Sequence, residues 1–110
     1  MNTLHPETVE AFHEALANHP AAMADFYKDS CPGCKMLDAS LAKLTAPEFD
    51  GLVLIKAKLE VLGEDFFKGL GLRQTPSLIA YRDGAEVARL PGFQPPDKLE
   101  AWVQEHLLKK

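Results

Sequence analysis

Apolar residues recur at helical spacing in four segments of the chain. In the first, Val9, Phe12 and Leu16 share one face. This segment is predicted to form a helix that begins at Pro6 and ends before Pro20, because proline suits the first turn of a helix and disrupts its interior. The other predicted helices cover residues 32–44, 63–70 and 96–108.

Dense apolar runs separate these helices. Residues 21–27 and 52–59 are predicted to be strands buried on both faces, whereas residues 77–81 and 85–90 flank Asp83-Gly84, a strong hairpin signal. Residues 1–4 are a candidate for one more strand. Strands alternating with helices, followed by a hairpin and a last helix, predict an α/β fold with a mostly parallel sheet, an antiparallel edge and helices on both faces.

Length and charge restrict the class of protein. The 110 residues, 46% of them hydrophobic, suit a single domain over residues 1–110. The net charge of −4 argues against a nucleic-acid partner, and no apolar run reaches the roughly 18 residues of a membrane span. No secretory signal is visible and only two cysteines occur, so we expect a cytoplasmic protein, although a chain that had lost its leader would show the same pattern.

The two cysteines form the segment Cys31-Pro32-Gly33-Cys34, where a predicted strand leads into a predicted helix. The unpaired N–H groups of a first helical turn point at the sulfur of Cys31, and the helix dipole favours negative charge there. The turn also brings Cys34 beside Cys31. We therefore expect Cys31 to be the exposed, reactive thiolate and Cys34 to be the covered thiol.

Asp25 is an acidic residue inside an apolar strand, six residues before Cys31. A buried carboxyl has a raised pKa, which would suit proton transfer to or from Cys34. The alternative is a half-exposed strand residue paired with Lys56 or Lys58. The sequence leaves both interpretations open, because the register of the strands is not defined.

Two simpler explanations of the cysteine pair are weak. A structural zinc site needs about four ligands, and the scattered histidines (His5, His13, His19 and His106) supply none at suitable spacing, so no metal is predicted unless two chains share a site. A purely structural disulfide closing so short a loop would stabilise the fold little. The charged neighbours of the pair are interpreted as solvated side chains: Lys28, Asp29, Lys35 and Asp38.

The residues around the pair carry a family resemblance. Residues 25–37, Thr75-Pro76, the turn at residues 81–84 and Gly92 together resemble the motifs of thioredoxins. The resemblance implies a thioredoxin-like fold, a central mixed β-sheet flanked by helices on both faces, and thiol–disulfide exchange as the activity. It also implies a catalytic role for Asp25 with Lys58 nearby, and a cis Thr75–Pro76 bond that binds substrate with Gly92.

The predicted activity is that of a protein-disulfide reductase in which Cys31 attacks and Cys34 resolves the mixed disulfide. It needs no cofactor beyond this pair. The predicted partners are disulfide-containing proteins and a thioredoxin-reductase-type electron donor, and the chain is predicted to be a monomer.

Three departures from the family pattern leave the redox potential and partner choice open: Pro32-Gly33 is the reverse of the usual Gly-Pro order, Ser30 replaces a tryptophan and Ala39 replaces a proline. Two alternatives follow. One is a glutaredoxin-like enzyme acting on glutathione mixed disulfides, although glutaredoxins reach their active site much sooner than residue 31. The other is a non-enzymatic module that binds a metal or a partner protein.

Overall fold

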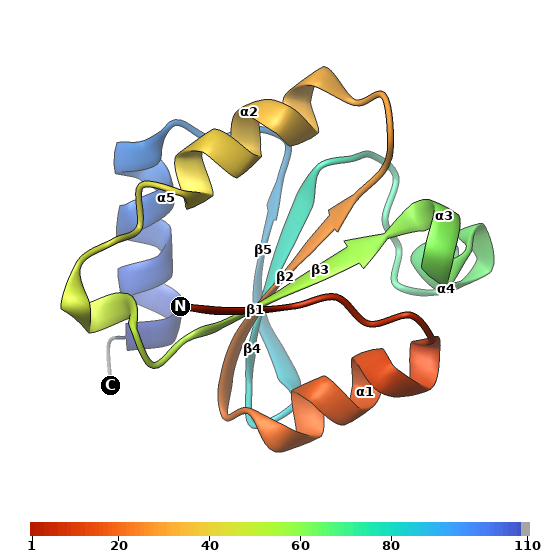
Figure 1. Ribbon diagram of the computed structural model, residues 1–110, viewed down its shortest axis with the longest axis horizontal. Helices are drawn as coiled ribbons and strands as arrows, with labels where there is room; N and C mark the ends of the chain where they lie inside the picture. Colours follow the sequence, from red (N-terminus) through yellow and green to blue (C-terminus); the bar gives the residue numbers. More distant parts are fainter. Residues whose placement is uncertain (109–110) are drawn as a thin grey trace.

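A mixed five-stranded sheet forms the centre of the molecule (Figure 1). The computed structural model describes residues 1–108. The strands are β1 (Asn2–Leu4), β2 (Ala21–Tyr27), β3 (Val53–Lys58), β4 (Ser77–Arg82) and β5 (Ala85–Pro91). They lie in the order β1-β3-β2-β4-β5, with β1, β3 and β2 parallel, and with β4 and β5 antiparallel to their neighbours. The predicted mixed sheet with an antiparallel edge is confirmed, although it is not mostly parallel, since two strand pairings are parallel and two are antiparallel; residues 2–4 do add a strand.

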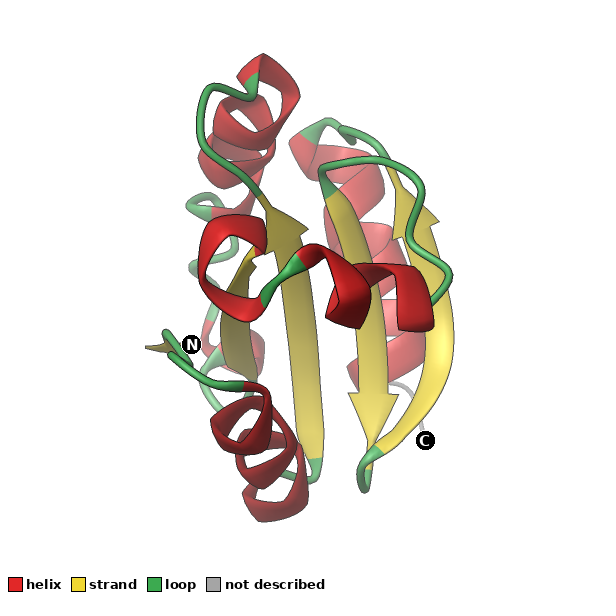
Figure 2. Cartoon of the chain, turned by 90° about the vertical axis from the view of Figure 1, so that its right-hand side faces the viewer, coloured by secondary structure: helices red, strands yellow, loops and turns green. Residues whose placement is uncertain are grey.

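Helices cover both faces of this sheet (Figure 2). They are α1 (Val9–Asn18), α2 (Pro32–Leu41), α3 (Leu59–Leu62), α4 (Glu64–Gly69) and α5 (Pro96–Val103), with a 3-10 turn η1 (Pro47–Phe49) and a π-helical turn η2 (Gln104–Leu108). One buried cluster joins the sheet to α1, α3 and α4, and a second joins it to α2 and α5. The predicted α/β class with helices on both faces is confirmed. Among residues 1–108, no helix has both the length and the apolar character needed to cross a bilayer.

The central strand β2 contributes to both cores. Ala22, Ala24 and Phe26 belong to the cluster under α1, whereas Met23 belongs to the cluster under α2. Successive side chains of a strand point to opposite faces, so burial on both faces produces the continuous apolar run in the sequence. Asp25 alternates with these residues in the same way and therefore lies on the α2 side of the sheet.

Helix boundaries differ from the predicted ones at several points. The first helix begins at Val9, not at Pro6, because Thr8 is its N-cap. The second ends at Leu41 rather than near residue 44, although Leu44 remains buried in the same core. The strand predicted for residues 52–59 ends at Lys58, and α3 follows it directly. Lys58 makes no side-chain capping hydrogen bond, so the sequence carries no signal for the start of this helix.

Thr8→Ala is expected to destabilise the protein by about 1 kcal/mol. The Thr8 hydroxyl oxygen accepts a hydrogen bond from the Ala11 N–H at 3.0 Å, and the substitution leaves this N–H without its acceptor. Urea denaturation of the variant measures this loss. Thr45→Ala, in an exposed loop, serves as the control. An equal effect of the two substitutions would contradict the capping role.

Candidate active site

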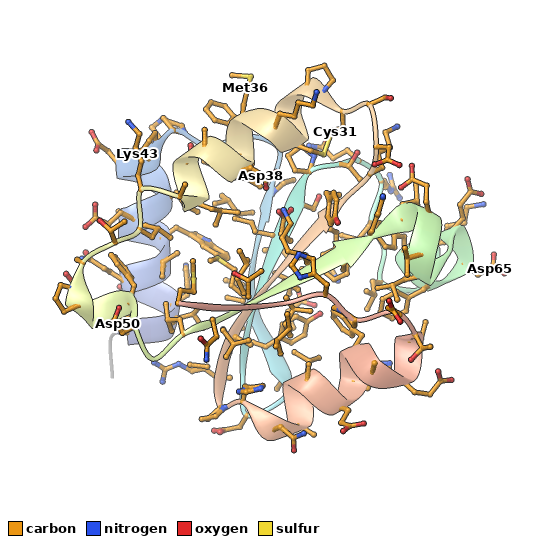
Figure 3. The ribbon with its side chains drawn as sticks, in the orientation of Figure 1. Cys31, Met36, Asp38, Lys43, Asp50 and Asp65 are labelled. Carbon is orange, nitrogen blue, oxygen red and sulfur yellow. A yellow bond between two sulfur atoms is a disulfide. The ribbon has the colours of Figure 1, made fainter. Side chains whose placement is uncertain are left out.

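Cys31 and Cys34 meet at the N-terminal end of α2, where the chain leaves the carboxyl end of β2 (Figure 3). Ser30 turns the chain with a positive φ of 54°, and Cys31 is the N-cap of the helix. The sulfur of Cys31 accepts the backbone N–H of Cys34 at 3.2 Å, as the sequence predicts. The two cysteines are joined by a disulfide, with their Cα atoms 5.2 Å apart. This amide remains in place to stabilise a Cys31 thiolate when the pair is reduced.

The expected contrast in exposure between the two cysteines is absent. Cys31 is 7% exposed and Cys34 is 5% exposed, so the prediction of an open Cys31 beside a covered Cys34 is wrong for this oxidised state. The cause is the loop before β4, which lies against Cys31. The two sulfurs differ in their contacts. The Cys31 sulfur caps the N-terminus of α2 and contacts the loop before β4.

That loop contains a cis Thr75–Pro76 peptide bond, as the resemblance implies. Because β4 is antiparallel to β2, the start of β4 lies at the same edge of the sheet as the end of β2. Cys31 Sγ is therefore 3.8 Å from the Thr75 carbonyl oxygen and 3.7 Å from the Thr75 hydroxyl oxygen. A Cβ placed at Gly33 would lie 3.2 Å from Pro76 Cδ, so a side chain there would crowd the loop.

Gly92 follows β5 and holds the same loop. Its backbone N–H donates to the Pro76 carbonyl oxygen at 2.8 Å, and its φ of +79° is one that L side chains rarely adopt. The structure thus brings Thr75, Pro76 and Gly92 together beside Cys31, from three segments distant in the sequence.

Asp25 is fully buried in the interior of the protein. Its Oδ2 atom accepts a hydrogen bond from Lys56 Nζ at 2.7 Å, whereas its Oδ1 atom has no hydrogen-bond partner among residues 1–108. Burial raises the pKa of the Asp25 carboxyl, and the nearby Lys56 ammonium opposes that effect without cancelling it. A buried carboxyl that holds its proton more tightly than usual is suited to exchange protons at a higher pH than an ordinary aspartate.

Lys56 links the strand that carries Asp25 to the helix that carries the cysteines. Its Nζ atom lies 2.7 Å from Asp25 Oδ2, 2.5 Å from Asp38 Oδ1 and 4.3 Å from the centre of the Tyr27 ring. Asp38 is one helical turn after Cys34 and lies on the side of α2 that faces the sheet, opposite Met36 (Figure 3). The interpretation of Asp38 as a solvated charge therefore missed its ion pair, although its side chain is 53% exposed.

The lysine beside Asp25 is Lys56 and not Lys58, which the resemblance implied. Asp25 pairs in register with Lys56 across β2 and β3, so both side chains project from the same face. Lys58 instead pairs with Asp29 at 3.1 Å, at the start of the loop to α2.

Asp38→Asn is expected to lower the pKa of Asp25. The negative charge of Asp38 raises the pKa of Asp25 directly, and Asp38 also pairs with the Lys56 ammonium. When the charge of Asp38 is removed, Lys56 interacts with Asp25 alone and favours its ionised form. A pH titration of the Asp25 carboxyl carbon by NMR would measure the shift. Asp50→Asn removes the same charge from an exposed site at the far side of the molecule (Figure 3). An unchanged titration in Asp38→Asn, or the same shift in Asp50→Asn, would contradict this role.

Within residues 1–108, no group of three His, Cys, Asp or Glu side chains is placed to hold a metal ion. The chemistry that the site does display is that of the disulfide and of the buried carboxyl beneath it.

Comparison with known proteins identifies the family. A family model described as a thioredoxin-like domain matches residues 9–107. This chain belongs to the thioredoxin-like family. The thioredoxin of Bacillus subtilis (strain 168) is 32% identical over 85 residues, covering 77% of this chain and 81% of the relative. The thioredoxin of Alicyclobacillus acidocaldarius is 26% identical over 96 residues, covering 87% and 90% of the two chains.

Solved structures agree with this thioredoxin-like assignment. A mutant thioredoxin from Halobacterium salinarum NRC-1 has a TM-score of 0.82 at 22% identity, covering 96% of this chain and 91% of that one, which shows the shared fold. A structure named Trxlp, from Edwardsiella tarda EIB202, has a TM-score of 0.78 at 28% identity, covering 92% and 97%. With its paired cysteines at disulfide distance, this thioredoxin-like protein is a thiol–disulfide oxidoreductase.

Proposed function

We propose that the protein reduces disulfides of other proteins, with Cys31 as the attacking thiolate and Cys34 as the resolving thiol. The observation that carries this assignment is the position of the Cys31 sulfur, which is capped by the Cys34 amide at 3.2 Å and lies 3.8 Å from the Thr75 carbonyl oxygen. The first contact favours the thiolate, and the second places it beside a backbone that an incoming chain can pair with.

The reaction proceeds by two exchanges. In the reduced protein, the Cys31 thiolate attacks one sulfur of the substrate disulfide, whose second sulfur leaves as a thiolate and takes up a proton. Cys34 then loses its proton and attacks the Cys31 sulfur, which releases the second substrate thiol. Two electrons have moved from the Cys31–Cys34 pair to the substrate, and the protein is left in the disulfide state that the structure shows.

Asp25 would take the proton of Cys34 in the second exchange. Its Oδ1 atom makes no hydrogen bond within the described residues 1–108 and is the atom available for this transfer. Its raised pKa keeps the carboxylate basic enough to accept a proton from a thiol more readily than an ordinary aspartate would.

The cis Thr75–Pro76 segment and Gly92 would form the substrate platform. An extended segment of the substrate would pair with the backbone of Thr75, in the manner of a strand added to a sheet edge. The Gly92 N–H donates to the Pro76 carbonyl oxygen, so this hydrogen bond joins the two parts of the platform before substrate arrives.

The electrons must be replaced by a dithiol donor. A thioredoxin-reductase-type protein is the proposed donor, with no cofactor bound to this chain. We propose a monomer acting in the cytoplasm, a reducing compartment that suits a chain with only two cysteines.

The function is tested by following reduction of a protein disulfide and of a glutathionylated peptide in parallel, with dithiothreitol as electron donor. Catalysis of the protein disulfide, with a smaller gain on the glutathionylated peptide, is expected. The reverse preference would instead support the glutaredoxin-like alternative, and no gain on either substrate would contradict the proposed function.

A further inference from the structure

A basic pocket of about 200 Å³ lies directly beside the proposed substrate platform. Its wall includes Lys28 from the loop after β2, Lys68 from α4, and Arg73 from the loop before β4. Among residues 1–108, Glu64 is the one carboxylate that lines it. The three cations come from three different segments, so the fold and not a run of sequence brings them together.

Like Lys35, Lys43 and Lys98, these three cations have no ion pair among residues 1–108, but they are the unpaired cations that line one pocket. Within residues 1–108, the ion pairs involve other lysines and arginines, and Lys28, Lys68 and Arg73 have none. The acidic groups next to Lys28 are already engaged, since Asp29 pairs with Lys58 and its backbone N–H donates to Glu60. A protein with a net charge of −4 thus keeps an excess of positive charge here, three cations against the one carboxylate of Glu64.

This basic pocket is joined to the redox pair through Thr75. Thr75 lines the pocket, and its hydroxyl oxygen lies 3.7 Å and its carbonyl oxygen 3.8 Å from the sulfur of Cys31. A chain that pairs with the Thr75 backbone therefore places neighbouring side chains within the reach of these three cations. Successive side chains of an extended segment point to alternate sides, which directs some of them into the pocket.

We propose that the basic pocket binds an acidic side chain of the substrate segment, so that the protein favours disulfides flanked by Asp or Glu. This specificity rests on the proposed reductase function. Lysine and arginine at an exposed site attract a carboxylate mainly over short range, so the effect should appear as tighter binding and weaken with added salt.

The test uses two synthetic peptides with an identical disulfide, one flanked by two glutamates and the other by two glutamines, with dithiothreitol as electron donor. The wild type is expected to show a kcat/KM about fivefold higher for the glutamate peptide, at low salt. In Lys68→Gln/Arg73→Gln this ratio should fall to about one, through KM rather than kcat.

The matched control is Lys43→Gln/Lys98→Gln, which changes the net charge equally at exposed sites outside the pocket; Lys43 lies at the opposite end of α2 from Cys31 (Figure 3). The control should keep the fivefold ratio. The proposal is overturned by any of three results: the control loses the fivefold ratio, Lys68→Gln/Arg73→Gln keeps it, or the wild type does not show it. In each of these cases, reduction of the glutamine peptide still supports the reductase function.

Glutathione disulfide is a third substrate. If it alone slows in Lys68→Gln/Arg73→Gln, the pocket serves glutathione and the proposal is wrong. If no substrate is reduced, the proposed function fails, and the specificity with it.

Discussion

Cys31→Ser is expected to reduce the rate of disulfide reduction to that of dithiothreitol alone. A serine hydroxyl does not form a disulfide, and the sulfur lost is the one capped by the Cys34 amide and placed beside Thr75. The measurement is turnover of a protein disulfide with dithiothreitol in excess.

Cys34→Ser is the matched control for this loss. It removes an equally buried sulfur but keeps Cys31, so the first exchange should proceed and the mixed disulfide should accumulate. Mass spectrometry should find the substrate attached to Cys31. An adduct that forms in Cys31→Ser and not in Cys34→Ser would reverse the assignment of the two cysteines.

Asp25→Asn is expected to slow the second exchange about tenfold at pH 7 and to leave the first exchange little changed. An ordinary thiol is only about 3% ionised at this pH, so a base that removes its proton can accelerate attack by at most about thirtyfold. The defect should shrink as the pH rises towards 9, because less help from a base is needed to remove a thiol proton there. Rapid-mixing kinetics with a chromogenic disulfide separates the two exchanges. A defect that persists unchanged at pH 9 would contradict a role in proton transfer.

The same substitution is expected to stabilise the protein at pH 8, because the raised pKa of Asp25 means that burying its charge costs more than the pairing with Lys56 returns, and Lys56 keeps its contact with Asp38. Urea denaturation at several pH values would measure this gain. A variant less stable than the wild type at pH 8 would show that the Lys56 ion pair outweighs the cost of burial.

The pH dependence of this gain follows from the raised pKa of Asp25. Below its ordinary value of 3.8, Asp25 is protonated in both the folded and the unfolded protein and costs nothing. As the pH rises through the folded pKa, the folded state must hold a buried charge, and its free energy of unfolding falls. The difference between variant and wild type should therefore grow as the pH rises above 3.8 towards the raised pKa of the folded protein. Lys56 has a raised pKa, so its contribution persists throughout that range and is lost only above its ordinary value of 10.5.

Periodicity alone predicted the order of the main elements, because both cores are built from regular apolar faces. The strand at residues 21–27 is buried on both sides, and its continuous apolar run reflects that directly. Short helices are harder to predict. Leu59–Leu62 continues an apolar pattern without a capping side chain, so the end of β3 and the start of α3 have no distinct signal.

The lysine that pairs with Asp25 could not be identified from the sequence, because the pairing depends on the register between β2 and β3. Lys56 and Lys58 lie on the same face of β3, two residues apart, and composition does not distinguish them. Asp38 at the fourth position after Cys34 carried a usable signal, since residues four apart share a face of a helix. Its partner on β3 could be found only once the packing of α2 on the sheet was known.

The basic pocket and the burial of Cys31 had no signal of this kind. Lys28, Lys68 and Arg73 are ordinary exposed residues in the sequence, and the loops that bring them together have no periodicity. Cys31 is covered by the segment around Thr75, more than forty residues away along the chain. Contacts of this length are set by the fold as a whole and not by local pattern.

Cys31 and Cys34 are expected to form one reversible two-electron couple. The decisive measurement equilibrates the protein in dithiothreitol or glutathione redox buffers and counts free thiols by alkylation and mass spectrometry. We expect both thiols to disappear together in a single two-electron transition, between about −270 mV for a thioredoxin-like reductant and about −180 mV for an isomerase-like protein. If the two cysteines are alkylated independently, or stay reduced across this range, they do not form such a couple.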